Sequence, residues 1–67
     1  MQTILEGEIY KNNKTRRCIL VLGIAEESDS ELVLAIADVN LQTGLAGEPG
    51  ELTIPKTELT DWELVDV

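Results

Sequence analysis

The sequence predicts an all-β fold: a small five-stranded barrel with a single short helical turn before the last strand. Two observations and one physical argument lead to this fold class. The 67 residues suffice for one small domain, so residues 1–67 are treated as a single domain. Apolar residues occur in short runs that alternate with polar residues or are rich in β-branched side chains, and segments rich in Gly, Asn and Ser separate these runs. Closure into a barrel would also limit the exposed strand edges.

The first expected strand is segment 3–10. It alternates, with Leu5 and Ile9 on one side and acidic residues on the other. Segment 11–14 is a turn by its chemistry, because Asn tolerates the left-handed region and bonds its own backbone.

Two long strands should follow. Segment 16–25 is the most apolar run, and its two apolar faces indicate a central strand. Segment 26–30 is acidic and polar, which predicts an exposed hairpin loop. Segment 31–40 contains the helix formers Leu and Ala, so a helix is an alternative there. We favour a strand, because a five-residue loop lets it pair with the preceding run.

The remaining elements are short. Segment 40–50 holds three of the five glycines and a proline, which predicts a loop. A short strand over 51–54 ends at Pro55. Segment 56–62 is expected to form one helical turn, and the alternation of 62–67 predicts the last strand.

The expected core takes one apolar face from each strand. Its members are Leu5, Ile9, Cys18, Leu20, Leu22, Leu32, Leu34, Ile36, Ile54, Leu59, Trp62 and Leu64. The opposite faces are also apolar, and they carry Ile19, Val21, Val33, Ala35 and Val39. This is more apolar surface than one small barrel can hide, and a homodimer would cover it.

The composition excludes several classes of protein. There is no histidine, and a single cysteine, Cys18, can form neither an internal disulfide nor a zinc cluster. We therefore expect no enzyme activity, no cofactor and no metal site. The absence of a signal-peptide pattern and of any 18-residue apolar run predicts a cytoplasmic protein without a membrane-spanning helix.

The net charge of −8 is unevenly spread along the chain. Residues 1–17 carry a net +2 and residues 18–67 a net −10. Acidic surfaces repel phosphate, which disfavours ordinary nucleic-acid binding. Two interpretations of the acids stay open: they keep a small domain in solution, or they steer it toward a basic partner and imitate DNA.

The order of these motifs resembles that of small SH3-like barrels, especially uncharacterised ones encoded by bacteriophages and their bacterial hosts. The residues that carry the resemblance are Gly7-Glu8-Ile9-Tyr10, Arg17 before Ile19-Leu20-Val21-Leu22, Ala37-Asp38-Val39, Gly44, Ile54 and Leu59-Thr60-Asp61-Trp62. The resemblance implies a five-stranded SH3-like barrel and a binding role, and it implies no reaction.

Our first functional hypothesis is a non-catalytic module that docks on a basic protein, such as a phage-encoded inhibitor or DNA mimic acting on a host protein. The expected contacts are Glu26, Glu27, Asp29, Glu31, Glu48, Glu51 and Trp62. One alternative is an accessory nucleic-acid-binding barrel that uses the basic turn, with contacts from Lys11, Lys14, Arg16 and Arg17. Another is a structural subunit of a larger assembly.

Overall fold

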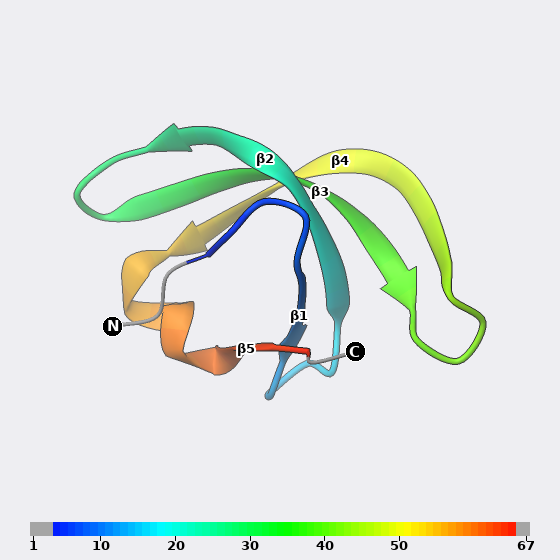
Figure 1. The fold of residues 1–67 in the computed structure, drawn as a ribbon. Coiled ribbons are helices and arrows are strands. Elements are labelled where there is room, and N and C mark those ends of the chain that lie inside the picture. Colours follow the sequence, from blue (N-terminus) through cyan, green and yellow to red (C-terminus); the bar gives the residue numbers. More distant parts are fainter. Residues whose placement is uncertain (1–3, 66–67) are drawn as a thin grey trace.

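The computed structural model describes residues 4–65, which form a single antiparallel sheet of five strands (Figure 1). The elements are β1 (Ile9–Asn12), β2 (Cys18–Glu27), β3 (Glu31–Asn40), β4 (Leu45–Pro55), a 3-10 helix η1 (Lys56–Asp61) and β5 (Trp62–Leu64). Their order across the sheet is β4-β3-β2-β1-β5. The all-β prediction is confirmed. Within residues 4–65, β4 and β5 stand at opposite ends of the sheet and do not pair, so the sheet is not closed.

The sheet bends strongly along β2. Strands β2, β3 and β4 form one layer, while β1 and β5 lie below it (Figure 1). The pairing of β2 with β3 shifts register twice, between Val21 and Gly23 and between Ile24 and Glu26. Each shift leaves one extra residue in β2, and such bulges increase the local bend and twist of a strand.

The core lies between the two layers and includes residues from every strand. Six of the expected core residues are buried there: Leu32, Leu34, Ile36, Ile54, Leu59 and Trp62. These residues belong to β3, β4, η1 and β5, and for β3, β4 and η1 the choice of face was correct. Strand β3 lies between β2 and β4, and from Leu32 to Ile36 it buries every second residue in the core.

The expected core face of the first two strands was wrong. Leu5 and Leu22 are 54% and 46% exposed, while Ile9, Cys18 and Leu20 are only half-buried. Leu64 of β5 was also expected in the core and is 52% exposed, although Trp62 of the same strand is buried. The buried residues are instead Ile4, Tyr10, Ile19 and Val21.

Pairing with β3 decides which face of β2 is buried. Val21 lies directly opposite Ile36, so the two side chains share the core face. Tyr10 is 1% exposed, and its hydroxyl oxygen accepts a hydrogen bond from the backbone N–H of Leu5 at 2.9 Å. Because both faces of β2 are apolar, its alternation alone cannot distinguish them.

The opposite face stays apolar, because Cys18, Leu20 and Leu22 take the places that Ile19 and Val21 leave for the core. Val33, Ala35 and Val39 stay on that face and are half-buried.

The predicted loop over 40–50 was also wrong. Only residues 41–44 form a turn, and β4 begins at Leu45. Gly44 supplies the left-handed conformation of this turn with a φ of 74°. The long strand β3 offers partners along its whole length, so the glycines after Gly44 become part of a strand. A register shift between Ala37 and Val39 accommodates the pairing.

The ends of the expected elements also changed. The first strand begins at Ile9, because residues 6–7 form a turn in which Gly7 has a φ of 81°. Thr3 lies outside the described residues, as do residues 66–67 of the last expected strand. The exposed hairpin after β2 and the helical turn before β5 are confirmed.

Candidate docking site

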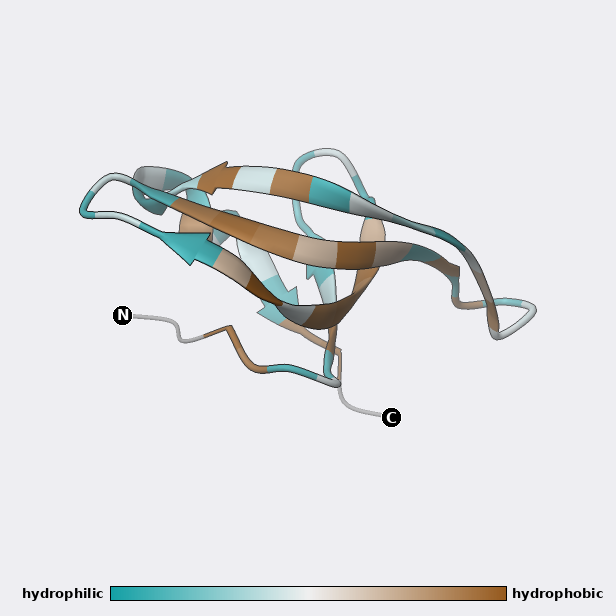
Figure 2. Cartoon of the chain, turned by 90° about the horizontal axis from the view of Figure 1, so that it is seen from above, coloured by the Kyte–Doolittle hydropathy of each residue, from teal (hydrophilic) through white to brown (hydrophobic). Residues whose placement is uncertain are grey.

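Acidic side chains gather where the β2–β3 hairpin turns. A hollow of about 260 Å³, called here the hairpin hollow, is lined by Glu26, Glu27, Ser28, Glu31 and Val33. Figure 2 shows the tip of this hairpin as hydrophilic, in contrast to the apolar stretches along β2 and β3. The sequence prediction that this loop carries exposed acids is thus matched by a concave surface with three carboxylates around it.

The hairpin turn is held by its serine. The N–H of Ser28 donates to the carbonyl of Glu31 at 2.9 Å, and the N–H of Glu31 donates to Ser28 Oγ at 3.1 Å. These bonds close a tight turn, because a serine hydroxyl can replace a backbone acceptor. Glu27 and Glu31 are thereby kept at the adjacent ends of two strands.

Lys56 connects the hairpin to η1. Its Nζ lies 2.9 Å from Glu27 Oε2, and its backbone N–H donates to the carbonyl of Ser30 at 2.8 Å. Of the three carboxylates, Glu27 is therefore already neutralised. Within the described residues Glu26 and Glu31 are exposed and have no ion pair, so their charges are available to a partner.

The other predicted contact residues lie elsewhere. Asp29 is exposed at the tip of the same hairpin but does not line the hollow. Glu48 and Glu51 are exposed on β4, and Glu51 lies opposite Ala35 of β3. Trp62 is 5% exposed and belongs to the core, away from the hairpin hollow.

A second hollow, of about 290 Å³, lies along β4 and is called here the edge hollow. Residues 52–55 form one wall, and Asn12, Thr15 and Arg17 form another, with Glu58 and Trp62 completing the lining. Sequence reasoning missed this feature. The sequence holds no local signal for it, because its lining comes from segments far apart in the chain.

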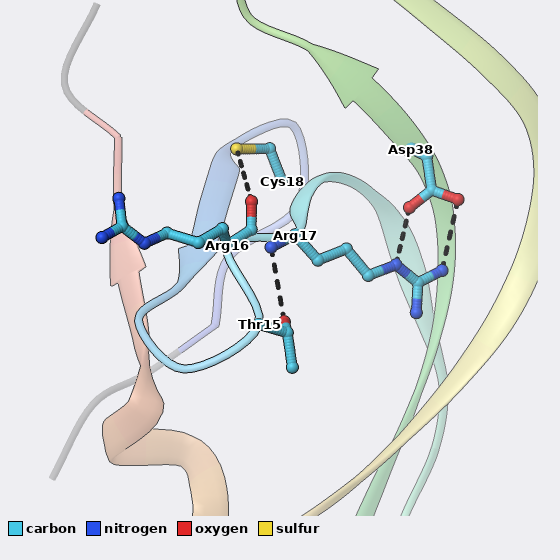
Figure 3. A network of polar contacts seen from close by, with 5 residues as sticks. All are labelled: Thr15, Arg16, Arg17, Cys18 and Asp38. Carbon is cyan, nitrogen blue, oxygen red and sulfur yellow. Dashed lines mark hydrogen bonds and ion pairs between the residues drawn. The ribbon is translucent and has the colours of Figure 1, made fainter.

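The four cations of the basic turn are partly engaged by acids. Arg17 donates from Nε to Asp38 Oδ1 at 2.7 Å and from Nη2 to Asp38 Oδ2 at 3.2 Å (Figure 3). Lys14 Nζ lies 3.5 Å from Asp61 Oδ2, and Lys11 stands opposite Glu63 in the β1–β5 pairing.

The Arg17–Asp38 pair also changes the acidity of both groups. The hydrogen bonds from the guanidinium lower the pKa of Asp38, and they raise the pKa of Arg17. Burial opposes both shifts, and the Coulombic attraction between the two charges adds to them.

The turn itself is strained at one residue. Asn12 Oδ1 accepts from the N–H groups of Lys14 at 2.8 Å and of Thr15 at 3.0 Å, which closes the turn. Arg16 then adopts a φ of 66°, an uncommon conformation for a residue other than glycine. Its side chain points away from that of Arg17, so the turn does not present the two guanidinium groups together (Figure 3).

Residues 4–65 contain no group of three or more His, Cys, Asp or Glu side chains placed to hold a metal ion. No helix in that part of the chain has the length and apolar character needed to cross a membrane. No protein-family model, curated protein or solved structure matches this chain.

Proposed function

We propose that this chain is a non-catalytic docking module that binds a basic protein through the acids of the β2–β3 hairpin. The observation that carries the proposal is the hairpin hollow, where Glu26 and Glu31 are exposed beside the apolar side chain of Val33 and form no ion pair with any residue of 4–65. Unpaired charges next to apolar surface suit a partner that presents lysine or arginine with its alkyl stem.

The charge balance supports the same partner class. The net charge of −8 raises the encounter rate with a basic surface and lowers it with nucleic acid. The fixed turn and the Glu27–Lys56 ion pair hold the hairpin in one shape before binding, which reduces the entropy cost of docking.

The alternative of a nucleic-acid-binding turn gains less support. Arg17 and Lys14 are each within ion-pair distance of an acid, so phosphate would have to compete with Asp38 and Asp61. The module we propose has the form of an unclosed SH3-like barrel of the phage or bacterial type. In that setting it acts in the cytoplasm as an inhibitor or DNA mimic on a basic host protein.

The test is a pull-down from host lysate with the wild-type chain and two double variants, each performed with and without nuclease. Glu26→Lys/Glu31→Lys reverses the two unpaired charges of the hairpin hollow. Glu6→Lys/Glu8→Lys makes the same change in net charge at exposed acids that precede β1.

A basic protein that survives nuclease, is lost with Glu26→Lys/Glu31→Lys and is kept with Glu6→Lys/Glu8→Lys would support the proposal. Equal loss with both variants would show that only overall charge matters. Loss of every partner on nuclease treatment would favour the basic turn instead.

A further inference from the structure

Strand β4 is an end strand, and its outer edge has no partner strand within the described residues. The pairing of β4 with β3 is continuous from Glu31↔Pro55 to Ala37↔Pro49. The next pair in this register is Ser30 with Lys56, and the N–H of Lys56 donates to the Ser30 carbonyl at 2.8 Å. In an antiparallel ladder successive residues turn their N–H alternately toward and away from the partner. Residues 49, 51, 53 and 55 therefore direct their backbone groups to the open edge.

Two of these four positions are prolines. Pro49 and Pro55 lack an N–H, and each stands where that N–H would have faced away from β3, so the ladder loses no bond. The open edge accordingly presents backbone donors at Glu51 and Thr53, with a proline on either side. Prolines on an edge strand limit indiscriminate pairing, and here they bracket a short stretch with two outward donors, Glu51 and Thr53.

The edge hollow lies along this stretch. Leu52, Thr53, Ile54 and Pro55 are consecutive and all line it. Neighbouring residues of a strand point to opposite faces, so a hollow bounded by four in succession runs along the strand's edge. Trp62 and the core-facing side chains of Leu52 and Ile54 give it an apolar side, while Asn12, Thr15 and Arg17 line it with polar groups.

The charges around the open edge of β4 indicate which kind of chain can bind there. Glu51 is exposed beside the open edge, and Glu58 lines the hollow. The cation of the hollow, Arg17, is held by two hydrogen bonds to Asp38. A second copy of this chain would bring another net charge of −8 to the same edge, which disfavours self-association there.

We propose that the open edge of β4 receives an extended segment of the basic partner as an added sixth strand. Main-chain bonds to Glu51 and Thr53 would supply the pairing, as in other cases of strand addition. Alternate residues of the added strand face inward, enter the edge hollow and are apolar. The residues between them face outward beside Glu51 and are basic. The recognised pattern is basic-apolar-basic. This inference rests on the proposed function, because it takes the partner to be basic.

The test uses the probe peptide acetyl-Lys-Val-Lys-Val-Lys-amide, titrated into the whole chain by calorimetry and by the fluorescence of Trp62. Thr53→Pro removes the open-edge N–H without taking a donor from the β3 ladder. Thr53→Val keeps that N–H and alters the side chain alone, so it is the matched control. Loss of a hydrogen-bond donor from the interface should weaken binding about tenfold in Thr53→Pro. Thr53→Val should stay within about twofold of the wild type.

A second measurement uses the wild-type chain, so that its result does not depend on whether Thr53→Pro folds. The same peptide methylated at the backbone nitrogen of its central lysine cannot donate there, and it should bind about tenfold more weakly. On peptide binding, the amides of Glu51 and Thr53 should also become protected from hydrogen exchange.

Three results would overturn the strand addition: no binding by the wild type, equal binding by Thr53→Pro and wild type, or a dimer that Thr53→Pro abolishes. The proposed function fails separately. If Glu26→Lys/Glu31→Lys loses the basic protein in the pull-down while Thr53→Pro retains it, docking at the hairpin stands and strand addition does not.

Discussion

Alanine replacement at two nearby positions of β2 tests which face of this strand is buried. Ile19 is fully buried in the core, whereas Leu22 is 46% exposed. Removing a buried isoleucine side chain to alanine costs about 2–5 kcal/mol of unfolding free energy, because transfer and cavity terms add. Burying a whole leucine contributes about 1.5–3 kcal/mol, so Leu22→Ala, at roughly half burial, should cost about 1 kcal/mol.

These magnitudes are large for a chain of this size. A 67-residue domain has a total stability of about 3–10 kcal/mol, so Ile19→Ala should leave it close to unfolding. Ile19→Val removes one methylene and should cost about 0.5–1.5 kcal/mol, which keeps the comparison measurable if Ile19→Ala does not fold. Leu22→Ala should lower the melting temperature by about 4–8 °C.

The assay is urea unfolding followed by the fluorescence of Trp62, which is itself in the core. Ile19 is β-branched and Leu22 is not, but β-propensities span only about 1 kcal/mol, so the larger part of the expected difference comes from burial. A greater loss of stability in Leu22→Ala than in Ile19→Ala would refute the assignment of faces. It would restore the pattern expected from the sequence, with Leu22 inside.

Two further predictions concern the ion pair and the glycines. The pKa of Asp38 is lowered by Arg17, so the pair's contribution is present above pH ~4 and lost as pH falls through the lowered pKa. Asp38→Asn should therefore cost less than about 1 kcal/mol at pH 7 and nothing at the acid end, in urea unfolding at several pH values; a difference that persists at low pH would contradict this. Gly44→Ala should cost about 1 kcal/mol because its φ is 74°, although an added Cβ meets nothing within 4 Å. Gly50→Ala, with equal space and no positive φ, should instead stabilise by about 0.4–1 kcal/mol, and a thermal melt of both variants checks the contrast.

The sequence located most strands because turn residues and apolar runs are local signals. The Asn-rich turn after β1 and the Ser28–Ser30 turn were expected and are present. The prediction of which face of β2 is buried was wrong for a non-local reason. Both faces of this strand are apolar, and its register with β3 decides which one lies in the core. The prediction of a loop over residues 45–50 was wrong for a similar reason. Taken alone, the glycines of this segment suggest a loop, but pairing with β3 makes it part of a strand.

In the candidate site, too, some features could be predicted from local sequence and others could not. The acids of the hairpin were predictable, since exposed loops carry charge and this loop lies between two clear strands. The edge hollow was not, because it brings Trp62 and Arg17 next to residues 52–55, and that proximity depends on the bend of the whole sheet. The engagement of Arg17 by Asp38 also joins residues from different strands, so it has no local signature.

The pairing of β1 with β5 has a consequence for the order of folding. Asn12 meets Trp62 across about 50 residues of intervening chain, while β2, β3 and β4 are joined by short turns. Closing a long loop has a larger entropy cost than closing a hairpin, so contacts between distant segments form late. We expect the β2–β3–β4 meander to form first and the β1–β5 ladder last. Trp62 would then report the final step in a refolding experiment, after most of the sheet has formed.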